Sequence, residues 1–290
     1  MTAGPMIVEP VLARKMWRTL EPYHAMIYFV PEAEAAYSAI GLHGRPAGYF
    51  ASRSAALGAP PVDVVIATFF NFYPGAVRRA MAGVWSTVTP DAVVAARLHA
   101  ADSALRRMLD ERIRGAEVAE AAELAREATT GCTLEGRPLY AGHAALPWPT
   151  EPHLVLWHAV TLLREHRGDG HVAVLAAEGV SACEALVLHG ATGEVPAELL
   201  RASRAWPDRE WEAACARLRA RGWLTTDEAL TDEGRAHREA VEQRTDALAL
   251  PPWAHLGPAR SDRLRELVRP LSRAAVEAST FAGRASLWDE

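Results

Sequence analysis

The feature that most restricts the fold of this chain is a pattern of helix-breaking residues that occurs twice. Residues 48–58 and 170–179 each read as a short apolar helix closed by glycine, which is favoured just beyond helix C-termini. A proline, a tryptophan and a Pro-Asp pair then follow in the same order in each copy. They are Pro74, Trp85 and Pro90-Asp91 in the first copy, and Pro196, Trp206 and Pro207-Asp208 in the second. Ala-rich helices can resemble one another through composition alone, but the shared order favours a duplicated unit, in effect a dimer fused into one chain.

The composition favours a mainly α-helical globular protein. Half of the residues are hydrophobic and 23% are charged, and alanine, the best helix former, is abundant. We therefore expect a first half over residues 1–142 and a second half over residues 143–290. Neither the N-terminal residues nor any apolar stretch reads as a signal peptide or a membrane span. Three widely spaced cysteines favour a reducing cytoplasm over a disulfide framework.

The second half contains the clearest local signature. Residues 210–221 have the spacing of an amphipathic helix, Gly222-Trp223-Leu224 ends it, and residues 225–234 are short enough for a tight β-hairpin. A further helix is expected to follow to about Asp246. This order predicts a winged-helix-like unit over about 196–246, with a small hairpin wing and a C-terminal helix beyond it. The layout resembles that of MarR-type regulators, whereas the wing position of the first half is degenerate.

Four phrases resemble a second, broader group of proteins. They are "EPYHAMIYFVPEA" (21–33), "GYFASRSAALG" (48–58), "ATFFNFYP" (67–74) and "LREHRGDGHVA" (163–173). They are similar to phrases in actinobacterial proteins of the SalK-like or EvbL-like kind, to which a helix-turn-helix fold has been assigned. The resemblance implies that fold, a bacterial cytoplasmic setting and a place near natural-product pathways. It implies no catalytic residues.

The charge pattern argues against tight DNA binding. A winged helix lays one helix in the major groove and touches phosphates with its wing, so both parts need positive or neutral donors. The expected wing instead carries four carboxylates and no basic residue: Asp227, Glu228, Asp232 and Glu233. The candidate reading helix also opens with acidic residues, and the whole chain has a net charge of −5. DNA remains a possible partner that the acidic wing disfavours.

Polar residues inside apolar segments are the candidates for a site. Glu21 and His24 are three apart, so a helix puts both on one face, where a carboxylate can orient an imidazole for acid–base chemistry. A helix cap or an exposed surface pair is the simpler interpretation of Glu21 and His24, and it needs no function. Asn71 lies among aromatic residues in 68–73, where an amide must bond the backbone or a ligand. Tyr49 and Arg53 are further candidate ligand-binding residues.

A second cluster lies in residues 158–171. The two glycines at 168 and 170 predict a break after a helix, so that His166, Asp169 and His171 project from a compact turn. His158 is a candidate ligand-binding residue before it. Imidazole and carboxylate can bind zinc or iron, but no HExxH and no third histidine at ligand spacing is present, so we expect no metal. A glycine-terminated helix with a new N-cap at Asp169 explains the same residues without function.

These observations leave two classes of function open. The first is a protein that binds a small organic molecule in a cleft between the halves, as an enzyme of natural-product metabolism that uses His and carboxylate acid–base chemistry. The candidate catalytic residues are Glu21, His24, His166, Asp169 and His171. No nucleotide, hydrolase or cofactor motif is present, so no cofactor is expected. The second is a ligand-responsive, MarR-like regulator that binds DNA. We expect no membrane partner, and a monomer and a dimer both remain open.

Overall fold

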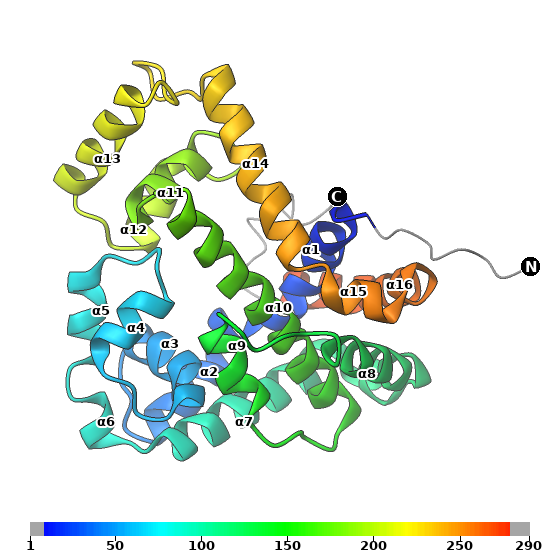
Figure 1. Ribbon diagram of the computed structural model, residues 1–290. Helices are drawn as coiled ribbons and strands as arrows, with labels where there is room; N and C mark the ends of the chain where they lie inside the picture. Colours follow the sequence, from blue (N-terminus) through cyan, green and yellow to red (C-terminus); the bar gives the residue numbers. More distant parts are fainter. Residues whose placement is uncertain (1–8, 279–290) are drawn as a thin grey trace, which may run out of the picture.

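The computed structural model describes residues 9–278, and helices dominate this range (Figure 1). The ends of the two predicted halves, residues 1–8 and 279–290, lie outside the described residues. The elements up to residue 144 are α1 (Val11–Ala25), η1 (Met26–Tyr28), α2 (Pro31–Ala39), α3 (Arg45–Ser54), η2 (Ala55–Leu57), α4 (Val62–Thr68), α5 (Pro74–Met81), α6 (Val84–Thr87), α7 (Pro90–Leu109), η3 (Asp110–Arg114), α8 (Ala116–Thr129) and α9 (Pro138–Ala144). The elements that follow are α10 (Pro152–Ala177), α11 (Ala182–Gly190), α12 (Ala197–Ser203), α13 (Asp208–Ala220), α14 (Asp232–Leu248), α15 (Pro251–Leu256) and α16 (Pro258–Ala278).

Local chemistry explains where many of these helices begin. Proline is the first residue of α7 and α10, where its missing N–H costs nothing and its fixed φ suits the first turn. The side chain of Thr89 accepts a hydrogen bond from the backbone N–H of Ala92 and so caps α7. A full capping box, formed by Ser181 and Glu184, starts α11. The predicted mainly α-helical class is therefore confirmed.

The larger hydrophobic core surrounds the first half of α10. Leu156, Ala159 and Val160 are almost completely buried there, and α8, α9, α1 and α14 pack against this helix. The same core includes residues of α15 and α16, such as Trp253 and Leu264, which come from the second predicted half. The division at 142/143 therefore stays a prediction, and one hydrophobic core draws on both sides of it.

A smaller core forms a second body. It joins the end of α10, α11, α12, α13 and α14 through residues such as Val174, Leu186, Leu218 and Val241. Figure 1 shows this body at the upper left, with α10 and α14 running from it into the larger body. Two continuous helices therefore connect the cores.

The predicted hairpin wing is wrong in detail. In the described residues the segment between α13 and α14 contains no β-strand, only one isolated antiparallel bridge between Leu224 and Leu230. The backbone N–H groups of Thr225 and Thr231 donate across the turn to the carbonyls of Ala229 and Trp223. The Thr225 hydroxyl also donates to Asp227, and the Arg219 side chain pairs with Glu228. The segment is too short and too polar to extend the pairing, so it forms a compact turn.

The predicted break at Gly168 and Gly170 is also wrong. Helix α10 continues through both glycines to Ala177. A Cβ at Gly170 would lie 2.8 Å from Nη1 of Arg137, so this glycine permits close packing inside a continuous helix. The duplication is consequently not supported over its first element, because residues 48–58 form α3 and η2 whereas residues 170–179 form the end of α10.

Among the described residues, no single helix has the length and apolar character to cross a membrane. Helices α10 and α11 together pass by length and composition, but they are bent by 103° relative to each other.

Candidate functional site

A cleft of about 360 Å³ lies between the two cores. Its wall is built from α1, α3, the segment after α4, the second half of α10, α11 and α14. Six of the nine predicted site residues line it: Glu21, Tyr49, Arg53, Asn71, Asp169 and His171. Residues distant in the sequence are thus brought to one cavity whose volume lies at the lower end of the range typical of ligand pockets.

The cleft contains a chain of buried ion pairs. Nη2 of Arg53 donates a bifurcated hydrogen bond to both carboxylate oxygens of Glu165, each at 2.9 Å, and Nη1 of Arg53 donates to the hydroxyl of Tyr49 at 2.7 Å. Arg164 binds the same carboxylate and also reaches Glu21 at 3.3 Å. Burial alone raises the pKa of Glu165, but Arg164 and Arg53 outweigh it and hold the pKa well below its usual range.

His171 is the cleft histidine with the clearest chemical role. Its Nδ1 lies 3.0 Å from the hydroxyl of Thr245, whose proton is donated to the carbonyl of Val241. The hydroxyl must then accept from Nδ1–H, which leaves Nε2 as a hydrogen-bond acceptor. Burial lowers the pKa of His171 to about 4, so the ring is neutral at pH 7. Neutral His171 is therefore able to accept a proton or a hydrogen bond.

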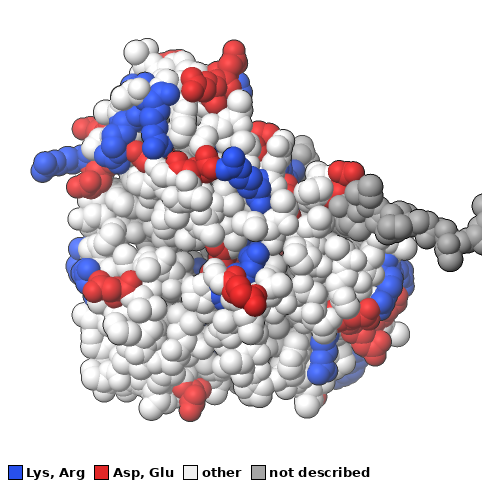
Figure 2. Space-filling model, in the orientation of Figure 1, with Lys and Arg blue, Asp and Glu red and all other residues white. Residues whose placement is uncertain are grey.

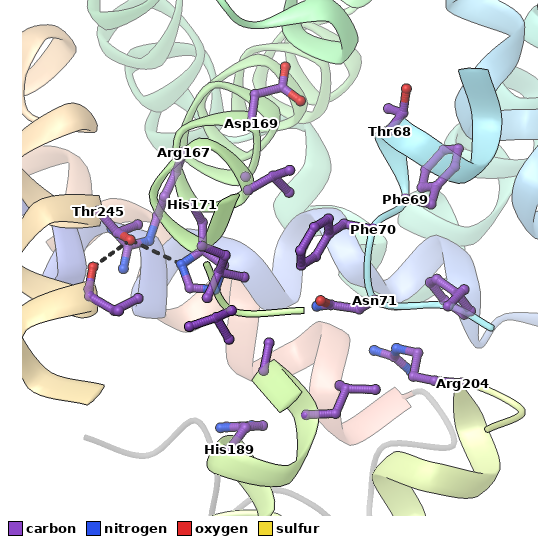
Figure 3. A pocket seen from close by; sticks show the side chains of 18 of the residues that line it. Thr68, Phe69, Phe70, Asn71, Arg167, Asp169, His171, His189, Arg204 and Thr245 are labelled. Carbon is purple, nitrogen blue, oxygen red and sulfur yellow. Dashed lines mark hydrogen bonds between the residues drawn. The ribbon is translucent and has the colours of Figure 1, made fainter. Parts of the chain in front are cut away.

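Asp169 has the opposite shift. Burial raises its pKa to about 6, although its carboxylate accepts the backbone N–H of Tyr140 at 2.9 Å, at the start of α9. Asp169 thus carries a proton more readily than an ordinary aspartate. Figure 3 shows it pointing away from His171, as their two-residue spacing on a helix requires.

The segment after α4 forms the opposite wall. Figure 3 shows Phe70 and Asn71 projecting toward His171, with His189 and Arg204 on a third side. Phe69 stacks its ring under the guanidinium of Arg53, with 4.6 Å from Cζ to the ring centroid. The wall formed by residues 68–72 is therefore mainly aromatic, whereas α10 and α14 line the cleft largely with polar and charged side chains.

Several polar atoms at the cleft have no hydrogen-bond partner among the described residues. They belong to four lining residues: Arg53 Nε, Asn71 Oδ1, His189 Nδ1 and His237 Nε2. A buried polar atom without a partner costs free energy comparable to a lost hydrogen bond. Several buried polar atoms without partners on one cavity wall are typical of a ligand-binding site.

Three predicted residues do not line this cleft. His24 is fully buried and bonds Thr161 and Tyr28, so the expected Glu21–His24 pair does not form; Glu21 bonds Arg164 instead. His166 accepts the backbone N–H of Thr133. Glu21 and His24 do lie three residues apart on α1, as predicted, but each side chain bonds a different residue of α10.

His158 lies apart from the cleft as well. It packs edge-on against Trp148, with 4.7 Å between ring centroids, and burial lowers its pKa to about 4. Burial likewise lowers the pKa of His166 to about 3. In the described part of the chain, no group of three or more His, Cys, Asp or Glu residues is arranged to hold a metal ion.

Sequence reasoning missed Arg164 and Glu165. The signal was present, because residues 154–163 of α10 are apolar except for His158 and Thr161, and a helix that is apolar on nearly every side is buried. Charges that continue a buried helix need partners. Arg164 and Glu165 therefore belonged among the candidates.

The mainly helical architecture agrees with the result of the family comparison. The chain belongs to a helix-turn-helix family, which matches residues 13–282. Comparison with curated proteins and with solved structures gave no match.

Proposed function

We propose that this protein binds a small organic molecule in the cleft between the two cores. The observation that carries the proposal is the meeting of six sequence-distant polar residues on one cavity wall, beside buried polar atoms without partners. Phe69, Phe70 and Phe72 supply flat apolar contact, and His171 and Asn71 supply hydrogen-bonding groups. An aromatic molecule that carries hydroxyl or N–H donors has the complementary chemistry.

The resemblance to SalK-like and EvbL-like proteins supports a natural-product intermediate as the ligand. In the catalytic form of the proposal, His171 takes a proton from a bound substrate through Nε2. Its depressed pKa keeps it neutral, and Thr245 fixes its tautomer. Asp169, with its raised pKa, is the candidate proton donor. The two residues point apart, so they serve different atoms of the substrate.

The test uses the full chain and small-molecule extracts of its producer. Native mass spectrometry detects what is captured, and the same mixtures are then followed for turnover. We expect His171→Leu to lose at least tenfold in binding, since it removes a hydrogen-bond acceptor from the cleft wall. His43→Leu is the control, because His43 is exposed and does not line the cleft. Equal capture by wild type and both variants would refute the cleft as the site.

A regulator that binds DNA is the second candidate function, and family membership favours it. One face of helix α13 packs on the smaller core, and Arg209 and Arg217 lie on its exposed face. Figure 2 shows basic side chains gathered at the upper left, where α13 lies in Figure 1. Acidic partners weaken this surface, however: Arg217 bonds Glu184, and Arg219 bonds Glu228. We therefore expect weak binding by the protein alone.

The two candidates share a structural connection. The side chain of Asn71 lines the cleft, and its backbone carbonyl accepts the indole N–H of Trp206 at 2.9 Å, two residues before α13 begins. A cleft ligand that moves Asn71 therefore acts directly on the start of α13. A gel shift with the upstream region of the gene tests DNA binding. Sub-micromolar affinity that falls steeply with salt supports the regulator, since phosphate contacts release counterions.

A further inference from the structure

A second cavity, of about 320 Å³, lies on the other side of Tyr49 from the cleft. Its wall is mainly apolar and aromatic, and it comes from η1, α2, α3 and the segments that join them. It includes Ile27, Tyr28, Val30, Ala33, Tyr37 and Leu42. Exposed Glu34 and Arg45 also line it and carry opposite charges. Their effects on a bound charge largely cancel, so buried groups decide which charge this cavity favours.

A buried charge behind this wall is that of Arg97. It is 4% exposed, and its Nη1 donates to the hydroxyl of Ser52, a cavity-lining residue, at 3.3 Å. Its Nη2 has no hydrogen-bond partner, and no carboxylate of residues 9–278 lies within ion-pair distance of it. The Tyr28 and Trp157 rings, 5.8 Å and 5.1 Å from Cζ, are its other neighbours. A buried guanidinium without an anion is costly.

The cleft arginines differ in this respect. Arg53 and Arg164 share the carboxylate of Glu165, so their charges are largely compensated. Arg97 has only a neutral hydroxyl and two aromatic faces. The uncompensated charge of Arg97 therefore lies behind the Ser52 and Tyr28 side of the cavity wall.

Tyr28 gives this wall a defined polarity. Thr161 donates its hydroxyl proton to the carbonyl of Trp157, so it accepts from Nδ1–H of His24 at 2.9 Å. Nε2 of His24 must then accept the Tyr28 hydroxyl proton at 2.7 Å. Burial raises the pKa of Tyr28, and Arg53, Arg164 and Arg97 oppose that effect against the single carboxylate of Glu165. Of these three arginines, Arg53 and Arg164 are paired with carboxylates and Arg97 is not, so Arg97 leaves a positive charge beside Tyr28.

We propose that this second cavity binds an apolar carboxylic acid, with its ring or chain among the aromatic residues and its carboxylate at Ser52, where Arg97 supplies the countercharge. The Ser52 hydroxyl already accepts from Arg97 and lies 3.3 Å from the carbonyl of Tyr49. Its proton can turn to the ligand while its oxygen keeps the bond to the guanidinium. His24, which the first cleft does not use, holds Tyr28 in place beside the carboxylate.

The test compares 2-naphthoate with its neutral isostere 2-naphthamide by isothermal titration calorimetry on the full chain. A charge-assisted hydrogen bond predicts that the acid binds about tenfold tighter than the amide or more. Arg97→Gln should remove that preference while the amide affinity stays unchanged. Ala33→Leu should weaken both probes, because Ala33 is a buried residue of the cavity wall.

Asn71→Ala is the matched control, since it alters the first cleft and leaves this cavity intact. Equal affinity for the acid and the amide in the wild type overturns the proposal. So does a preference for the acid that survives Arg97→Gln, or binding that Ala33→Leu does not weaken. Should Arg97→Gln fail to fold, Ser52→Ala must lose the preference, and its persistence in that folded variant overturns the proposal equally. Failure here leaves the first cleft untouched, because its test uses different residues and ligands.

Discussion

The ion pairs around Glu165 predict a large effect from a small change, Glu165→Gln. This side chain is 1% exposed and accepts hydrogen bonds of 2.9–3.0 Å from both Arg53 and Arg164. The substitution keeps the shape but removes the negative charge from between the buried guanidinium of Arg53 and the partly buried guanidinium of Arg164. Breaking a buried pair in this way costs about 3–5 kcal/mol, which corresponds to a fall in Tm on the order of 10 °C for a chain of this size.

The effect should depend on pH with a definite sign. The folded pKa of Glu165 is depressed, so its contribution to the free energy of unfolding is fully present above the unfolded value of about 4.3. That contribution is lost as the pH falls from there through the folded pKa. The difference in stability between wild type and Glu165→Gln is therefore largest near pH 7 and shrinks below about pH 4.

Thermal unfolding followed by circular dichroism at several pH values measures this difference. Glu120→Gln is the control, because Glu120 forms an exposed pair with Arg263 and solvent screens such pairs. Its Tm should stay near that of the wild type. A Glu165→Gln variant that melts with the control, or one whose deficit is the same at pH 7 and pH 3.5, would show that Glu165 does not hold these charges together.

Two further predictions follow from packing and burial. In urea unfolding, Gly168→Ala should stabilise the protein by about 0.5–1 kcal/mol, since the added Cβ meets nothing closer than 3.7 Å. Gly170→Ala should destabilise it by about 1 kcal/mol, because the added Cβ displaces Arg137 from its carbonyl partners, and the same sign for both variants would contradict the packing role of Gly170. Burial raises the pKa of the thiols of Cys132 and Cys183 to about 12 and that of Cys215 to about 11, so native protein at pH 8 should react with iodoacetamide far more slowly than urea-unfolded protein. Rapid labelling of the native protein, read by mass spectrometry, would contradict this prediction.

The helices were predictable where local chemistry dominates. Proline at a helix start fixes φ wherever it occurs, so the starts of α7 and α10 could be read from Pro90 and Pro152 without knowledge of the tertiary structure. The break at Gly168 and Gly170 could not be corrected in the same way. Two glycines cost a helix about 2 kcal/mol, which packing on both sides of α10 can offset. The sequence does not reveal that Arg137 will lie against Gly170.

The candidate site was predictable as a set of residues but not as a set of pairs. Polar groups in apolar segments must find partners, and this rule selected Arg53, Asn71 and His171 for the cleft wall. Which partner each group finds depends on the elements that pack together. Glu21 and His24 share a helical face, yet Arg164 binds one and Thr161 the other.

The position of the cleft follows from the sequence of α10 itself. Its residues up to Leu163 belong to the larger core, and those from Val174 belong to the smaller one. The polar stretch between them, residues 164–173, therefore lies where neither core covers the helix completely. One rigid helix thus holds both cores and presents its charged middle at the boundary between them. A ligand bound there touches elements of both bodies, so it should restrict their relative motion as well as fill the cavity. Such a ligand stabilises the folded chain by mass action, and its binding should raise Tm with the logarithm of its concentration.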